Sequence, residues 1–190
     1  MILPIYAYGN PVLKKVAKDI DADYPGLEKL LEDMWETLYH SNGIGLAAPQ
    51  IGKAIRIFLV DTEQLDENKP EEEQTGDGIK QVFINAEVIE EAGEDWPYEE
   101  GCLSIPDVSG DVERPEEVTI RYFDENFKEY QQTFIGMNAR VIQHEYDHIE
   151  GILFTELLKP AKKQRIRRKL ESIRKGKAKP KYPMVFYSKK

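Results

Sequence analysis

Cysteine and long apolar runs are the scarcest features of this 190-residue chain. Its one cysteine, Cys102, excludes an internal disulfide, and a lone thiol is either a buried small side chain or a reactive or metal-binding group. No apolar run reaches the roughly 18 residues of a membrane-spanning helix. The first residues also lack the basic region and apolar run of a signal peptide, so we expect a cytoplasmic protein.

The charge is distributed unevenly along the chain. The net charge is -9, but residues 159–190 contain 14 Lys/Arg and a single acid, Glu171. Residues 1–158 are therefore strongly acidic. A length of 190 residues and 41% hydrophobic content fit one globular domain with an appended tail. We predict a domain over 1–160 and a basic helix and tail over 161–190, which favours an anionic partner.

Apolar periodicity predicts a mixture of helices and strands with few β-α-β alternations, which is typical of the α+β class. An acidic segment over 66–78 has no apolar face, and we expect it to be a solvated loop. The predicted helices cover 11–17, 25–41, 138–149 and 162–175, and the predicted strands cover 54–60, 81–85, 118–123, 129–135 and 182–187.

The segment His-Glu-Tyr-Asp-His at 144–148 is the strongest chemical signal in the chain. On a helix, His144 and His148 project from one face and can hold one divalent metal ion. Glu145 lies beside them and can take a proton from a water molecule that the metal activates. The bland alternative is an amphipathic helix that holds two histidines for packing, and the motif alone favours the metal site.

Two histidines leave such a metal short of ligands, because a catalytic site usually has three protein ligands. One zinc-protease class places a third histidine after the motif, but that position here is Phe154. Another class uses a downstream glutamate, and Glu171 has no supporting motif. The remaining candidate is Cys102, whose thiolate suits Fe²⁺ or Zn²⁺.

Three blocks resemble peptide deformylase, namely Gly-Ile-Gly-Leu-Ala-Ala-Pro-Gln at 43–50, Glu-Gly-Cys-Leu-Ser at 100–104 and Gln-His-Glu-Tyr-Asp-His-Ile-Glu-Gly at 143–151. They follow the order of that family, and the resemblance covers roughly 3–160. It implies antiparallel sheets around a central metal-binding helix. It also implies a cytoplasmic hydrolase that removes the N-formyl group from the initiator methionine of nascent polypeptides and releases formate.

The resemblance also assigns roles to residues. It makes Cys102, His144 and His148 the metal ligands and Glu145 the general acid and base. The Gln50 amide and the Leu103 backbone N–H would stabilise the oxyanion. The implied metal is Fe²⁺, which Zn²⁺, Ni²⁺ or Co²⁺ can replace. The implied substrate-binding residues are Gly43, Ile44, Gly45, Tyr98, Glu100, Gly101, Met137 and Val141. Taken individually, the side chains at 44, 98, 137 and 141 favour core packing, and only the resemblance to the family points to a substrate pocket.

Several details stay open at this point. Asp147 either accepts a hydrogen bond from a ligand imidazole or is a solvated helix residue. Glu100 is expected to pair with Arg114, as an equivalent pair does in the family. Gly43 and Gly45 either let the substrate approach closely or form a plain turn. His40 is expected at a helix end.

The partners follow from the same reasoning. The basic segment is either a solvated end or, as family precedent suggests, a surface that docks on ribosomal RNA. We expect neither DNA nor a membrane as a partner. A zinc peptidase and a non-catalytic ribosome-associated factor are the competing functions. The missing downstream ligand weighs against the peptidase, and the intact Gln50, Cys102 and Glu145 weigh against the factor.

Overall fold

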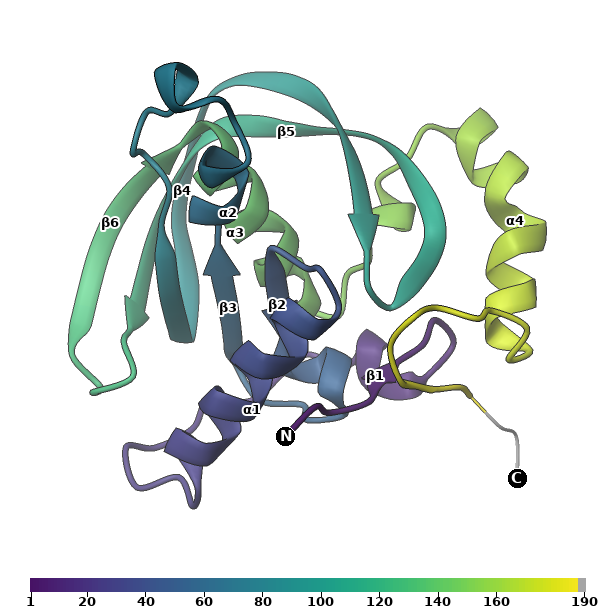
Figure 1. Cartoon of the computed structure of the whole chain (residues 1–190), viewed down its shortest axis with the longest axis horizontal. Coiled ribbons are helices and arrows are strands. Elements are labelled where there is room, and N and C mark those ends of the chain that lie inside the picture. Colours follow the sequence, from purple (N-terminus) through teal and green to yellow (C-terminus); the bar gives the residue numbers. More distant parts are fainter. Residues whose placement is uncertain (188–190) are drawn as a thin grey trace.

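A five-stranded antiparallel sheet and a central helix form the body of the protein (Figure 1). The structure is a computed structural model that describes residues 1–187. The strands lie in the order β2-β3-β4-β5-β6, which confirms the expected α+β class. None of the helices within residues 1–187 has the length and apolar character that a membrane crossing requires. The bounds are β2 (Gly45–Ala47), β3 (Ile57–Asp61), β4 (Lys80–Cys102), β5 (Ile105–Phe123) and β6 (Glu129–Ile135).

Strands β4 and β5 form one long hairpin that arches away from the sheet and returns to the centre of the molecule (Figure 1). Register shifts along the pair bend it, and only residues 103 and 104 connect the strands. Sequence periodicity predicted strands over 81–85 and 118–123 and none between them, which is wrong. The intervening arm is rich in glutamate and contains Pro97 and Pro115, so its pairing with the partner strand, rather than an apolar pattern, makes it β-structure.

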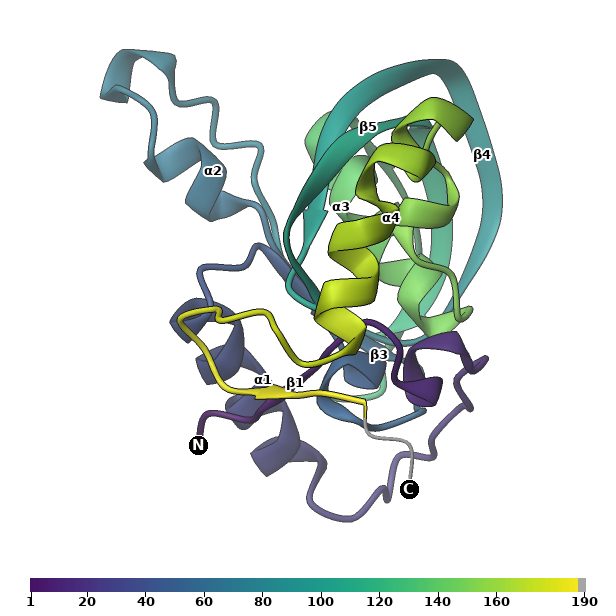
Figure 2. The same ribbon diagram turned by 90° about the vertical axis from the view of Figure 1, so that its right-hand side faces the viewer.

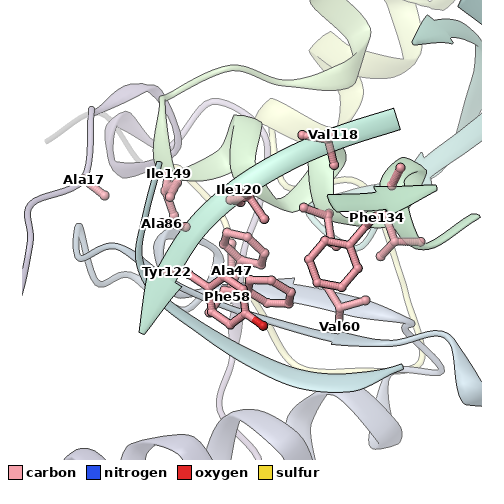
Figure 3. Close-up of a cluster of buried hydrophobic side chains, with 14 residues drawn as sticks. Ala17, Ala47, Phe58, Val60, Ala86, Val118, Ile120, Tyr122, Phe134 and Ile149 are labelled. Atoms are coloured by element: carbon pink, nitrogen blue, oxygen red, sulfur yellow. The ribbon is translucent and has the colours of Figure 1, made fainter. Parts of the chain in front are cut away.

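Helix α3 (Gly136–Ile149) carries the His-Glu-Tyr-Asp-His segment and packs against the sheet. Its buried side chains Ala139, Ile142 and Ile149 belong to a core cluster with aromatic residues from four strands (Figure 3). Phe83 stacks on Phe58 with ring centroids 4.7 Å apart. The predicted central helix is therefore present, and it begins two residues earlier than the expected 138.

Helix α1 (Leu27–His40) covers the other face of the sheet. Alternation along β3 explains the two cores, because successive side chains on a strand point to opposite faces. Phe58 belongs to the cluster of α3, whereas Ile57 and Leu59 belong to the cluster of α1. His40 is the last residue of α1, as predicted.

The two ends of the chain meet beside the body (Figure 2). Strand β1 (Ile5–Tyr6) pairs in parallel with β7 (Met184–Val185). Helix α4 (Pro160–Arg174) precedes β7 along the chain and buries Ile166 and Ile173 in a third hydrophobic cluster. The basic segment is therefore packed on the body through α4, and its residues 188–190 lie outside the described part.

Short elements complete the chain. The acidic segment expected as a loop contains two short helical turns, and all of its residues from 67 to 77 are exposed. Asp66 accepts hydrogen bonds from the backbone of Thr75 and Gly76, which closes the segment on itself. The short elements are η1 (Pro11–Lys14), η2 (Ala48–Ile51), α2 (Glu63–Glu67), η3 (Glu71–Glu73) and η4 (Phe154–Glu156).

Candidate active site

Three candidate ligand atoms converge between α3 and the end of β4. The two imidazoles lie one helical turn apart on α3, with ring centroids 5.2 Å apart. Cys102 reaches them from the last position of β4, and its Sγ lies 3.3 Å from His148 Nε2. The donor atoms of Cys102, His144 and His148 all lie within 4.8 Å of one another. One sulfur and two nitrogens at this separation fit a single divalent transition metal.

Neither position that the other zinc-protease classes use for a third ligand supplies one here. Phe154, at the position where one zinc-protease class has its third ligand, stacks against His144 with ring centroids 6.1 Å apart. Glu171 lies on α4 and pairs with Arg174 and Lys175. Neither residue can therefore complete the site.

Glu145 is buried beside the ligands, with 4% of its surface exposed. Its Oε2 atom has no hydrogen-bond partner within the described residues. Burial raises the pKa of Glu145 to about 7, so in the protein without metal the carboxyl group can exist in both protonation states near neutral pH. A carboxyl group of that kind can both accept and return a proton.

Gly45 provides the room for this carboxylate. A Cβ atom at Gly45 would overlap the Glu145 side chain, and one at Gly43 would lie 2.9 Å from Leu103 Cδ1. Both glycines are therefore needed for close packing, beyond any role in a turn.

Gln50 and Leu103 both lie next to Cys102. Gln50 is 1% exposed, and its Nε2 lies 3.4 Å from Cys102 Sγ and 3.3 Å from Ser104 Oγ. Its Oε1 accepts a hydrogen bond from the Ala47 backbone, which fixes the amide with its NH₂ toward the cluster. Leu103 is the first residue of the β4–β5 turn.

Glu100 anchors helix α3 to the hairpin. It accepts two hydrogen bonds from Arg114, at 2.6 and 3.1 Å, one from Arg140 at 3.0 Å and one from His144 Nδ1 at 2.8 Å. The expected pair with Arg114 is thus present. Burial by itself would raise the pKa of Glu100, but the hydrogen bonds from His144 and Arg114 lower it below its usual value. The charged carboxylate therefore orients the His144 ring and leaves its other nitrogen for a metal.

Asp147 follows neither of the two readings that the sequence left open. Its Oδ2 accepts a hydrogen bond from Arg114 Nη1 at 2.8 Å, so it contacts the anchor of His144 and not the imidazole itself. His148 Nδ1 is buried without a partner within the described residues. Burial holds the pKa of His148 well below its usual value, and a neutral imidazole is the form that binds metal.

A cleft of about 910 Å³ opens onto this cluster, which is a size typical of ligand sites. Every predicted substrate-binding residue lines it, and of the predicted ligands only His148 does not. Glu100 is largely engaged by Arg114, Arg140 and His144. Sequence reasoning missed several further lining residues. Among them are Arg140, an arginine on the buried face of α3, and Lys179, Lys181 and Tyr182, which follow α4 and carry no motif.

Fold and site together define a metal-dependent hydrolase of the α+β class. A family model described as polypeptide deformylase matches residues 2–164. Peptide deformylase from Christiangramia forsetii is 54% identical over 98% of this chain and 96% of its own length. The one from Flavobacterium psychrophilum is 51% identical over the whole of both chains. A solved peptide deformylase from Legionella pneumophila has a TM-score of 0.79 at 34% identity, covering 94% of this chain and 99% of its own.

The chain belongs to the polypeptide deformylase family. It is a metal-dependent enzyme of protein biosynthesis that hydrolyses the N-formyl group from the initiator methionine of nascent polypeptides and releases formate. The predicted family and activity are thereby confirmed, and the peptidase and the non-catalytic factor are set aside.

Proposed function

We propose that Cys102, His144 and His148 hold the metal ion of this deformylase. The observation that carries the proposal is the convergence of their three donor atoms within 4.8 Å. A divalent metal held by these residues would lower the pKa of water and polarise a carbonyl oxygen. We propose Fe²⁺ as the natural metal, with Zn²⁺, Ni²⁺ or Co²⁺ able to replace it, because a thiolate beside two imidazoles suits these ions.

Glu145 acts as the general acid and base in this proposal. Its unpartnered Oε2 takes the proton of the attacking water and delivers it to the nitrogen of the leaving amine. The formyl carbon then leaves as formate. The Gln50 Nε2 and the Leu103 backbone N–H donate to the oxyanion that develops on the formyl oxygen, and losing one such donor costs about 10²–10³-fold in turnover.

The substrate lies in the cleft with its methionine side chain against Ile44, Tyr98, Met137 and Val141. These side chains come from three separate segments and line one cleft, which supports a shared apolar pocket. Gly43, Gly45, Glu100 and Gly101 line the same cleft. The small residues among them allow the extended substrate backbone to lie close to the protein.

The test is formate release from a formyl-Met tripeptide by anaerobically prepared protein loaded with Fe²⁺ or Ni²⁺. Glu145→Gln keeps the shape of the side chain and removes its ability to exchange protons at neutral pH. Formate from the wild type and almost none from Glu145→Gln, at equal metal content, is the expected result. Equal rates would remove Glu145 from the mechanism. Faster loss of activity in air with Fe²⁺ than with Ni²⁺ is expected for iron beside a thiolate.

We also propose that residues 1–160 form the catalytic domain and that the basic helix and tail over 161–190 dock on ribosomal RNA in the cytoplasm, where nascent chains emerge. Arg165, Arg167 and Arg168 are exposed on α4, and phosphate contacts would make the binding salt-dependent. Because α4 buries Ile166 and Ile173, deletion would damage the core. Charge reversal is the sharper test.

The experiment compares co-sedimentation with ribosomes at low and high salt. The variant Arg165→Glu/Arg168→Glu is expected to lose binding, whereas Lys15→Glu/Lys53→Glu, which changes the charge by the same amount elsewhere on the surface, is expected to keep it. Equal binding by the two variants would refute docking through α4.

A further inference from the structure

The two-residue turn between β4 and β5 is held from outside the hairpin at each of its residues. The Ser104 carbonyl accepts a hydrogen bond from the Tyr8 backbone N–H at 2.9 Å, and the Ser104 hydroxyl is within 3.3 Å of Gln50 Nε2. The Leu103 carbonyl accepts a hydrogen bond from the Tyr182 hydroxyl at 2.7 Å. Both partners of the turn carbonyls come from the terminal segments, far from the hairpin in sequence.

These terminal segments form one unit, which we call the terminal clamp and define as residues 5–8 and 182–185 (Figure 2). The Ile5 N–H donates to the Pro183 carbonyl and the Ala7 N–H to the Val185 carbonyl, each at 2.9 Å. The side chain of Asn10, which is 8% exposed, donates to the Val185 carbonyl at 2.8 Å. The clamp is thus cross-linked by both backbone and side-chain hydrogen bonds.

Tyr182 is the member of the clamp that reaches the active site. It lines the cleft together with Leu103 and Cys102, and it packs against the core cluster of α1. Its hydroxyl donates to a backbone carbonyl, so it is not offered to a substrate. The pairing of Cys102 with Ile105 across the hairpin fixes the backbone just before Leu103. A hydrogen bond to the Leu103 carbonyl fixes the backbone just after it. The two contacts together restrict the backbone torsions of Leu103.

We propose that Tyr182 is a positioning residue for deformylation. By holding the Leu103 carbonyl, it keeps the Leu103 N–H in the direction from which that group donates to the developing oxyanion. The segment after α4, which carries no recognisable motif, is therefore a working part of the active site. This inference rests on the proposed role of Leu103 in the deformylation reaction.

The expected fall in kcat follows from the role of the Leu103 N–H, the group that Tyr182 positions. Complete loss of an oxyanion donor costs about 10²–10³-fold in turnover. Loosening a donor that is still present costs part of this, and we expect a fall of about 10-fold in kcat for Tyr182→Phe. The KM is expected to stay within about twofold, because the donor acts mainly in the transition state.

The experiment uses the full-length, metal-loaded enzyme and a formyl-Met tripeptide. Tyr187→Phe is the matched control. It removes a hydroxyl from the same terminal segment, and this hydroxyl has no hydrogen-bond partner within residues 1–187. Incorporation of 4-aminophenylalanine at position 182 returns an N–H donor to the ring and is expected to restore most of kcat. Metal content, melting temperature and hydrogen–deuterium exchange over 99–107 are measured for each variant.

The inference predicts faster exchange over 99–107 in Tyr182→Phe only, with a lower kcat, an unchanged KM and full metal content. Wild-type kcat in a folded Tyr182→Phe would overturn it. A fall in kcat that is explained by lost metal would also overturn the inference. So would a rise in KM as large as the fall in kcat, or a failure of 4-aminophenylalanine to restore kcat. If the wild type releases no formate, the proposed function fails instead, and the exchange data still decide whether Tyr182 holds the turn.

Discussion

Glu100 is the residue at which one substitution should separate structural from catalytic consequences. It is 5% exposed and accepts hydrogen bonds from Arg114, Arg140 and His144. The substitution Glu100→Gln keeps the size of the side chain but removes the negative charge. It removes the carboxylate that Arg140 and Arg114 share and leaves Arg114 with Asp147 alone. Breaking a buried ion pair in this way costs about 3–5 kcal/mol.

This cost is large beside a total unfolding free energy of about 5–15 kcal/mol for a typical domain. The matched control is Glu87→Gln, because Glu87 also pairs with an arginine, Arg121, but its side chain is 59% exposed. Exposed pairs contribute about 0–1 kcal/mol. Both variants thus lose the negative charge of an ion pair, within a buried network at Glu100 and on the surface at Glu87.

The assay is urea unfolding of the metal-free proteins at neutral pH, analysed where the variants share one m-value. Metal affinity is then measured separately, and Glu100→Gln is expected to weaken it by about 10–100-fold because His144 loses its orienting carboxylate. The reasoning is refuted if Glu100→Gln and Glu87→Gln differ by less than about 1 kcal/mol. Unchanged metal affinity would refute only the orienting role.

Three further perturbations test the core and the site. Gly45→Ala should lower formate release by up to about 10²-fold at unchanged metal content, because its Cβ displaces the Glu145 carboxylate; unchanged turnover would contradict this. Phe83→Ala should lower the free energy of unfolding by about 3–5 kcal/mol in urea, since Phe83 is fully buried, and a loss below 1 kcal/mol would show that the core collapses around the site. Burial raises the pKa of Tyr122 to about 12 from 10.0, so its contribution to stability is fully present below pH 10 and is lost as the pH rises through 12. The wild type should therefore lose stability more steeply than Tyr122→Phe over that range, and parallel curves would contradict the shift.

The helices were the part of the fold that local sequence predicted well. Helix α4 spans Pro160–Arg174 against an expected 162–175, and α3 spans Gly136–Ile149 against 138–149. A helix forms its hydrogen bonds within one segment, so its apolar period and breakers are visible locally. The arm of β4 and β5 between 86 and 117 was missed because its hydrogen bonds are made with a partner strand, and its exposed, glutamate-rich surface has no apolar alternation.

The candidate site, like the fold, has a part that local sequence predicts and a part that depends on distant contacts. The spacing of His144, Glu145 and His148 is a property of one helix, and the sequence alone placed their side chains together. Cys102 could be chosen as the third ligand because it is the only cysteine, but its distance from His148 depends on the path of the hairpin.

By itself, the sequence predicted the chemistry of the protein, because the proposed metal-binding pair and its proposed acid–base partner are local and the three family blocks are contiguous. Only the tertiary structure decided how these groups are held. The contacts of Glu100 with His144 and of Tyr182 with Leu103 join residues 44 and 79 positions apart. No local pattern encodes such contacts, because they exist only once the sheet, the helix and the two ends of the chain have packed together.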